Sequence, residues 1–225
     1  LTLTIEEGFK IRDEVKKTGR VFQVGTQQRS NESPMFKEAI AIVQSGRLGK
    51  KVNAFVAIGG TPLAKEKEPF PSVKPPDGLN WDMWVGGAQQ SDYSPERRKE
   101  FRWFFDYSGG KMTDWGAHHI DISQWAMGMD NTGPLNIEGT AEHPVPLKDG
   151  QPTQSDRYNV ATQFHVIANF PKDMVLHVVS EGENGITIEG TKATIFVSRS
   201  DLRDEQGTVV ADMLKDNPLP EGTIT

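Results

Sequence analysis

Residues 101–128 read FRWFFDYSGGKMTDWGAHHIDISQWAMG, and this stretch holds the clearest helix signal in the chain. The adjacent glycines Gly109 and Gly110 predict a close backbone approach just before a helix over about 111–127. Gly128 is placed to end that helix, because glycine readily adopts the left-handed conformation of a helix C-cap. The sequence on either side of this helix indicates the rest of the fold.

On the C-terminal side, apolar residues recur with a period of two, which indicates strands. The tripeptide at 171–173, Pro-Lys-Asp, predicts a hairpin turn between two of them. On the N-terminal side, a helix over 34–45 and a strand over 52–58 are predicted. The other expected strands are 136–143, 159–170, 174–181, 185–189 and 194–198. The predicted fold class is α+β, with a large, predominantly antiparallel open sheet and helices on one face.

The first thirty residues have an α/β character instead. A helix is predicted over 5–17, since Thr4 can cap it and Gly19 can end it. A short β-prone run at 21–24 follows. The chain lacks an initiator Met and enters a helix almost at once, so we expect it to begin inside a larger protein.

Composition excludes several classes of protein. The 25 Lys and Arg residues are outnumbered by 31 Asp and Glu, which argues against a nucleic-acid binder. No apolar run approaches the ~20 residues of a membrane span. The absence of cysteine removes thiolate metal sites and cysteine nucleophiles. No G-x-G-x-x-G occurs, so the sequence contains no recognisable pyrophosphate cradle.

Within the helix after Gly110, Asp114, His118, Asp121 and Trp125 fall on one stripe. A carboxylate and an imidazole one turn apart can act as a pair, in which the Asp orients the ring and the His exchanges a proton with a substrate hydroxyl. The structural alternative is that the Asp caps the first turn and the His is a satisfied core residue. Spacing alone slightly favours that alternative, whereas the glycines favour function because close packing there indicates a cleft wall.

A third interpretation is a metal site built from Asp114, His118 and His119. Adjacent residues on a helix diverge by about 100°. His118 and His119 therefore cannot easily share one ion, and we expect no metal.

The segment 59–99 is rich in Pro and Gly, and its apolar residues include Trp81 and Trp84. Long loops of this kind are often functional. Its aromatic side chains and those just after it can form stacking platforms for sugar rings or a local small core. The two interpretations remain open for Trp81 and Trp84, whereas Phe104 and Phe105 favour the core.

Two arginine positions have different expected roles. Arg29 follows GTQQ at a predicted strand end, a position that favours contact with an anionic or hydroxyl-rich ligand. Arg97 and Arg98 are expected to be solvated or to pair with Glu96 and Glu100.

The run GGKMTDWGAHHID at 109–121 resembles the G-G-x-x-x-D-x-G-x-H-x-x-D pattern of the glucose–fructose oxidoreductase / inositol dehydrogenase / MocA (Gfo/Idh/MocA) family. GRVFQVGTQQRS at 19–30 resembles the last strand of the family's nucleotide-binding domain and the turn that follows it. SGRLGKKVNAFVAIGG at 45–60 resembles the start of its substrate domain. The resemblance extends from residue 1 to about 199.

This resemblance implies two parts: residues 1–30 as the remnant of a Rossmann-type nucleotide-binding domain, and 31–225 as a substrate and oligomerisation domain with a truncated C-terminus. It implies an NAD(P)-dependent dehydrogenase of sugars, cyclitols or related polyols, with NAD or NADP as cofactor. The family's catalytic Lys and Gly-rich loop precede Leu1, so we expect this chain alone to be inactive.

Site roles follow from the same resemblance. Asp114 and His118 are the expected catalytic residues, and Gln28 and Arg29 are expected near the nicotinamide. The expected substrate-binding residues are Trp81, Trp84, Trp103, Lys111, Trp115 and His119.

Two alternatives to the dehydrogenase function remain open: an NAD-assisted glycosidase, and a non-catalytic sugar-binding or oligomerisation module. We expect a homo-oligomer formed through the open sheet, and no nucleic-acid or membrane partner. A bacterial, cytoplasmic protein is the primary expectation, with export as the alternative because the N-terminus is missing.

Overall fold

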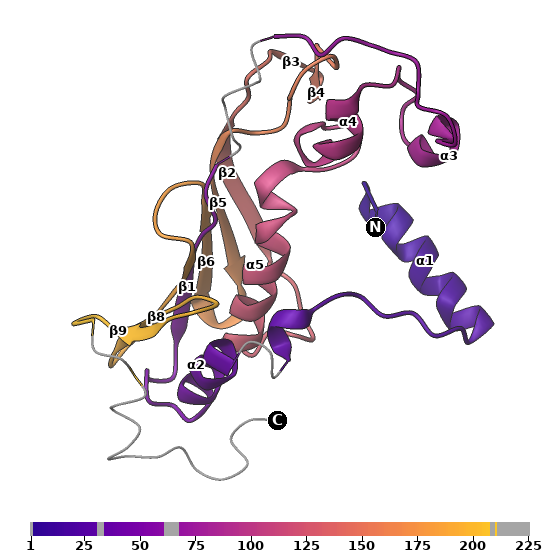
Figure 1. Ribbon diagram of the computed structural model, residues 1–225. Helices are drawn as coiled ribbons and strands as arrows, with labels where there is room; N and C mark the ends of the chain where they lie inside the picture. Colours follow the sequence, from indigo (N-terminus) through magenta and orange to yellow (C-terminus); the bar gives the residue numbers. More distant parts are fainter. Residues whose placement is uncertain (1, 31–33, 61–67, 208–209, 211–225) are drawn as a thin grey trace.

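A computed structural model describes residues 2–30, 34–60, 68–207 and 210 of the chain. Its centre is a seven-stranded sheet with the strand order β2-β5-β6-β1-β7-β8-β9 (Figure 1). Every neighbouring pair is antiparallel except β1 and β6, which are parallel. The strands are β1 Val52–Ala57, β2 Asn136–Glu142, β5 Gln163–Phe170, β6 Met174–Val179, β7 Gly185–Gly190, β8 Thr194–Val197 and β9 Leu202–Asp204.

Alternation along the strands separates a covered face from an open face. In β1 and β6, every second residue is buried, and the residues between them are only half-buried. Val56 and Leu176 belong to the covered face, whereas Phe55 and His177 lie on the open face, where their rings stack 4.5 Å apart. The period of two that indicated strands therefore also indicates which side chains enter the core.

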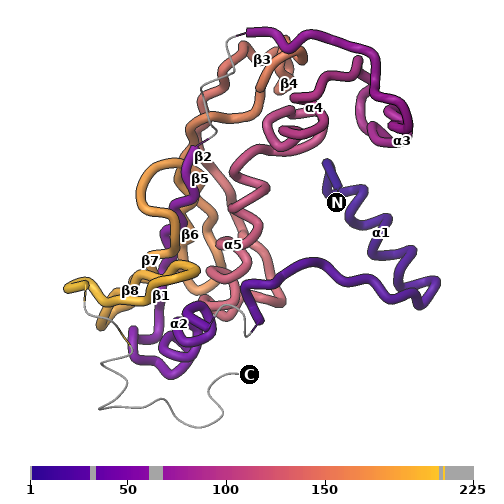
Figure 2. Tube along the Cα trace, viewed as in Figure 1, coloured from indigo at the N-terminus to yellow at the C-terminus, as the bar shows by residue number. Residues whose placement is uncertain are grey.

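Helices α2 (Pro34–Gln44) and α5 (Trp115–Ala126) pack on the covered face, as Figures 1 and 2 show. Phe36, Ile40 and Ile122 are fully buried between these helices and the sheet. This confirms the predicted fold class: a mostly antiparallel open sheet with helices on one face. The hairpin turn also forms as predicted, as the single turn η4 (Pro171–Asp173) between β5 and β6.

Helix α5 begins later than the sequence predicts. A 3₁₀ turn, η3 (Gly110–Met112), precedes it, and Asp114 has non-helical angles of φ −82° and ψ −81°. The adjacent glycines Gly109 and Gly110 allow the close backbone approach that the sequence predicts. Gly110 has φ 66°, and a Cβ on Gly109 would lie 2.5 Å from Cγ2 of Thr113.

A smaller lobe extends beyond the N-terminal end of α5 (Figure 1). It contains α3 (Trp81–Val85), α4 (Pro95–Lys99) and the turn η2 (Phe101–Trp103), with the short pair β3 (Leu147–Lys148) and β4 (Gln151–Pro152) beside them. The lobe has its own apolar cluster, whose buried members are Trp103, Phe104, Tyr158 and Val160.

Helix α1 (Ile5–Thr18) stands apart from the sheet (Figure 2). Thr4 and Glu7 form the capping box that begins it, and Gly19 ends it as predicted, but the helix buries no residue. Residues 21–24 are not part of a strand, because they pair with no other strand in the part of the chain that is described. A turn, η1 (Gln27–Arg29), then brings the chain back to α5.

Strand positions agree with the sequence prediction to within a few residues for β1, β2, β5, β6, β7 and β8. Strands β3, β4 and β9 are not predicted; each is only two or three residues long. None of the described helices combines the length and the apolar character needed to cross a membrane.

Candidate functional site

A small pocket lies between α5 and the segment that leads into η1. Its volume is ≈ 230 Å³, and it is lined by Val24, Gly25, Thr26, Gln28, Ala117, His118 and Asp121. His118 is half-buried, and neither of its ring nitrogens has a hydrogen-bond partner among the described residues. This imidazole is therefore free to exchange a proton with a molecule in the pocket.

Asp114, one turn before His118, is held by a different residue. Its Oδ1 accepts a hydrogen bond of 3.2 Å from Nε of Arg102, which lies in η2. Within the described residues, Asp114 neither caps α5 through its side chain nor bonds His118. The carboxylate of Asp114 and the ring of His118 are thus not hydrogen-bonded to each other, and the guanidinium of Arg102 gives the carboxylate a charged donor. Their catalytic roles stay a prediction.

Arg29 fastens η1 to the helix that carries His118. Its guanidinium contacts both carboxylate oxygens of Asp121 at 2.8 Å and reaches Asp130 at 2.8 Å as well. These two carboxylates raise the pKa of Arg29, that of Asp130 contributing most. The sequence predicts that Arg29 contacts a ligand, but every nitrogen of its guanidinium already donates to a protein oxygen. Arg29 therefore holds η1, next to one wall of the pocket, against α5, and we call this arrangement the Arg29 clamp.

Behind that wall, a polar network joins four distant parts of the chain. Nε of Arg199 donates to Oε1 of Gln28 at 2.9 Å, and Nε2 of Gln28 lies 3.2 Å from Nδ1 of His119. The other ring nitrogen of His119 lies 3.0 Å from Oδ1 of Asn184. Arginine can only donate, so the amide of Gln28 must offer its NH₂ group to His119. The proton of His119 therefore sits on Nε2 and is donated to Asn184.

This network places two of the predicted site residues in the interior. Gln28 is 2% exposed and His119 0% exposed, and their side chains face each other, while their predicted roles beside a nicotinamide and a substrate stay predictions. Burial is the main reason why the pKa of His119 is lowered from its usual value. A fully buried, neutral imidazole serves packing and hydrogen bonding.

The aromatic residues divide into core and half-buried positions. Trp103 is 8% exposed inside the lobe's apolar cluster, which favours a core position, and its role in substrate binding stays a prediction. Phe104 is fully buried there, as predicted. Trp81 and Trp84 stack on each other at 4.5 Å and remain half-buried. Tyr93 and Tyr107 pack edge-on against them, so this pair forms a local aromatic core.

Trp115, at the start of α5, lies under two cations. The guanidinium of Arg199 is 4.3 Å from its ring centroid, and Nζ of Lys111 is 5.6 Å away. Such contacts hold a cation over an aromatic face. The role of Lys111 and Trp115 in substrate binding stays a prediction.

Sequence reasoning missed Arg102, Asp130, Asn184 and Arg199, all of which contact predicted site residues. They lie in turns and loops outside the motif, where no local pattern marks them. Across residues 2–30, 34–60 and 68–207, no group of three or more His, Asp or Glu side chains is placed to hold a metal ion.

Comparison with known proteins identifies the class of domain. The model of a family described as "Oxidoreductase family, C-terminal alpha/beta domain" matches residues 36–216. The chain belongs to this family, the Gfo/Idh/MocA oxidoreductases. No curated protein matches it.

Solved structures share the fold at low sequence identity. An oxidoreductase from Thermotoga maritima matches with a TM-score of 0.55 and 17% identity, covering 99% of this chain and 60% of its own. The WlbA dehydrogenase from Bordetella pertussis, in complex with NADH and UDP-GlcNAcA, matches with a TM-score of 0.55 and 14% identity, covering 90% and 51%. A super-repressor mutant of Gal80p from Saccharomyces cerevisiae matches with a TM-score of 0.55 and 14% identity, covering 91% and 48%. This chain therefore spans about half to three fifths of the length of these proteins.

Proposed function

We propose that the protein carrying this chain is an NAD(P)-dependent dehydrogenase that oxidises or reduces a sugar, cyclitol or related polyol. The observation that carries the proposal is the position of His118, whose unpartnered imidazole lines a pocket against residues 24–28. Membership of an oxidoreductase family and structural likeness to a dehydrogenase in complex with NADH support it.

The chemistry needed from this chain is a proton exchange. Oxidation of a secondary alcohol requires a base for the hydroxyl proton, and a ring nitrogen of His118 can accept it and return it in the reverse direction. Asp114 lies one turn away with its carboxylate held by Arg102, and we assign it the role of orienting a substrate hydroxyl. Because α5 packs on the sheet, both side chains stand on a rigid element.

The pocket beside His118 fits one end of the cofactor. Its volume of ≈ 230 Å³ suits a single aromatic ring with its amide, and Thr26 brings a polar group to its wall. A nicotinamide, when bound, supplies or accepts the hydride. The match of the family's C-terminal domain model to residues 36–216 supports a division of the chain, in which we assign residues 1–30 to the end of a nucleotide-binding domain and 31–225 to the substrate domain.

The exposed apolar side chains of the first segment support this division. Leu3, Ile5, Phe9 and Val21 are all more than half exposed. Side chains of this kind usually pack against another surface. We assign that surface to the rest of the nucleotide-binding domain.

His118→Ala in the full-length protein tests the proposal. We expect kcat to fall by about 10²- to 10⁴-fold, the usual contribution of a general acid–base group, while the Kd for NADH or NADPH changes less than about twofold. His143→Gln is the matched control, because His143 lies outside the pocket. Full turnover by the His118 variant would remove this residue from the mechanism.

We also propose that two copies associate through the open face of the sheet. Phe55, Ile167 and His177 are half-buried there, and no helix of the described residues covers this face. Phe55→Asp places a charge at the centre of this face and is expected to convert the oligomer to a monomer in light scattering. A wild-type protein that stays monomeric at high concentration contradicts the association.

A further inference from the structure

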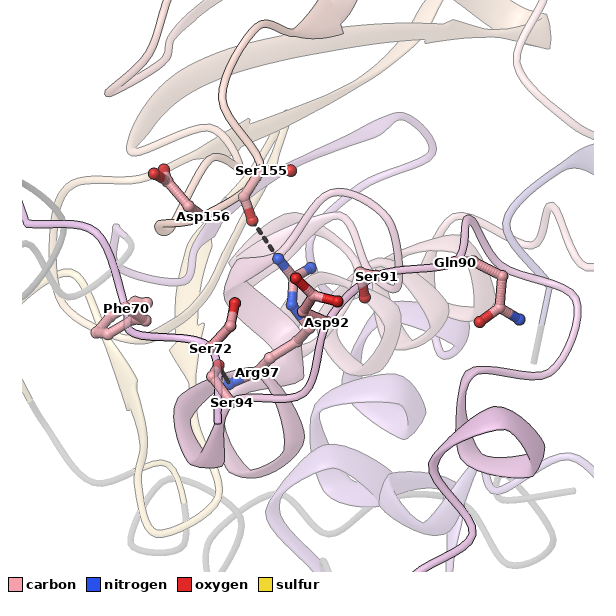
Figure 3. Close-up of a pocket in the computed structure, with 9 residues that line it drawn as sticks. All are labelled: Phe70, Ser72, Gln90, Ser91, Asp92, Ser94, Arg97, Ser155 and Asp156. Atoms are coloured by element: carbon pink, nitrogen blue, oxygen red, sulfur yellow. Dashed lines mark hydrogen bonds between the residues drawn. The ribbon is translucent and has the colours of Figure 1, made fainter. Parts of the chain in front are cut away.

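A second, larger pocket lies in the lobe and shares no lining residue with the pocket beside His118. Its volume is ≈ 530 Å³, enough for one pyranose-sized ring. Three segments form it: 70–72, the stretch from 90 into α4, and 155–156 (Figure 3). The lining residues are Phe70, Ser72, Gln90, Ser91, Asp92, Ser94, Arg97, Ser155 and Asp156.

The walls of this pocket are fixed by backbone hydrogen bonds. The N–H of Phe70 donates to the carbonyl of Asp156 at 2.7 Å, and that of Val73 donates to the carbonyl of Tyr93 at 2.9 Å. These bonds tie the 70–73 segment to both other walls. The hollow is therefore preformed, which lowers the entropic cost of binding a ligand in it.

The side chain of Arg97 forms the base of the pocket. The sequence predicts that Arg97 is solvated or paired with a neighbouring Glu, and the structure shows other partners. It is 6% exposed, and its guanidinium donates to Asp106 at 3.2 Å and to the carbonyl of Ser155. The ring of Phe104 lies under it at 4.7 Å. The charge of Arg97 is thus matched within the protein.

The remaining charges of the lining are negative. The carboxylates of Asp92 and Asp156 both border the pocket (Figure 3). Hydrogen bonding from Arg157 lowers the pKa of Asp156, so this group is ionised at neutral pH. A phosphate or carboxylate ligand would meet like charges here and is disfavoured.

Four polar side chains of the lining have no hydrogen-bond partner among the described residues: Ser72, Gln90, Asp92 and Ser155. Two other lining hydroxyls are already engaged, since Ser94 caps α4 and Ser91 bonds the hydroxyl of Tyr107 at 2.6 Å. The free groups are two hydroxyls, an amide and a carboxylate. Together they can donate to and accept from adjacent hydroxyls of one ligand.

An aromatic wall completes the pocket. Phe70 is half-buried, and its ring is held by Tyr158 at 4.9 Å and Phe104 at 6.0 Å. An aromatic ring held in place can pack against the C–H groups on one face of a ligand. The free polar groups beside it can bond hydroxyls around the edge of the same ligand.

We propose that this pocket binds a neutral sugar or cyclitol ring, with its hydroxyls on Ser72, Gln90 and Asp92 and its C–H side toward Phe70. Binding here requires neither a nicotinamide nor His118.

The test is a titration of this chain, without cofactor, with myo-inositol, glucose, maltose and cellobiose. The indole N–H of Trp81 donates to the carbonyl of Ser91, so its NMR resonance reports occupancy of the pocket. We expect saturable shifts for at least one of the four sugars. Asp92→Ala and Ser72→Ala should each raise the Kd by about tenfold, and glucose 6-phosphate should bind more weakly than glucose.

Asp82→Ala is the matched control, since Asp82 is exposed in α3 and does not line the pocket. It should leave the Kd unchanged, as should His118→Ala. No saturable shift with any of the four sugars overturns the proposal, as does an equal loss in the Asp82 and Asp92 variants. A dehydrogenase test that fails at His118 leaves this result untouched, so the two proposals can fail separately.

Discussion

The side-chain amide of Gln28 donates a hydrogen bond to Nδ1 of His119, across 3.2 Å, in the interior of the protein. Gln28 lies in η1 and His119 in α5, directly after His118. The bond favours the neutral form of His119, whose side chain leaves the helix about 100° from that of the candidate catalytic His118. Adjacent histidines therefore have different chemistry because only one of them is buried.

His119 should make the stability of the protein depend on pH. Its pKa is lowered from 6.5 in the folded state, mainly by burial, so below pH 6.5 the unfolded state takes up a proton that the folded state resists. Stability is full above pH 6.5 and falls as the pH drops toward the lowered pKa, by up to about 1.4 kcal/mol per pH unit. His119→Asn should flatten this slope in thermal melts between pH 7.5 and 5.5, whereas His143→Gln should keep it. A slope that is unchanged in the His119 variant contradicts the assignment.

The clamp formed by Arg29 should contribute to stability through geometry as well as charge. Arg29→Lys keeps the charge but cannot contact both oxygens of Asp121. We expect a loss of about 1 kcal/mol in urea denaturation, because the pair is partly exposed and screened by salt. Lys10→Ala, which breaks an exposed pair with Glu6 in α1, should cost much less. Equal effects of the two variants would show that Arg29 acts as an ordinary surface residue.

Arg102 should influence turnover through Asp114. Removing the donor at 3.2 Å in Arg102→Gln leaves the carboxylate free to change its orientation. In the full-length protein we expect kcat to fall by about tenfold, which corresponds to about 1.4 kcal/mol of transition-state stabilisation. Arg102→Lys should recover part of the loss, and Arg98→Gln should have no effect. An unchanged kcat would mean that Asp114 needs no partner for its orientation.

Trp103 should behave as a core residue. Trp103→Ala removes a side chain that is 8% exposed and should lower the free energy of unfolding by about 3 kcal/mol. Trp84→Ala should lower the free energy of unfolding by less than Trp103→Ala, because Trp84 is only half-buried. A Trp103 variant that keeps its stability and loses sugar binding would restore the substrate-platform hypothesis.

The sequence predicts the strands whose side chains alternate between core and open face. In β5, for example, Phe164, Ala168 and Phe170 alternate with the polar residues Gln163, His165 and Asn169 in the sequence itself. The same is true of the turn at 171–173, since proline and residues that tolerate positive φ mark it. Short strands such as β9 carry too few residues for a periodic signal.

The site is predicted less completely, because burial at a given helical position is set by partners that are distant in sequence. His118 and His119 are chemically identical and adjacent, and only Gln28, Asn184 and Arg199 make one of them an interior residue. Arg97 is a similar case: its local acidic neighbours predict a surface pair, but Asp106 and Ser155 draw it inward.

The place of β1 in the sheet has a consequence for synthesis at the ribosome. This strand is the first of the seven to be made, yet it lies between β6 and β7, which follow more than a hundred residues later. Both edges of β1 stay unpaired until those hairpins emerge, and the exposed segment is apolar. Folding of the nascent chain is therefore expected to finish late, with a long interval in which chaperones can recognise β1.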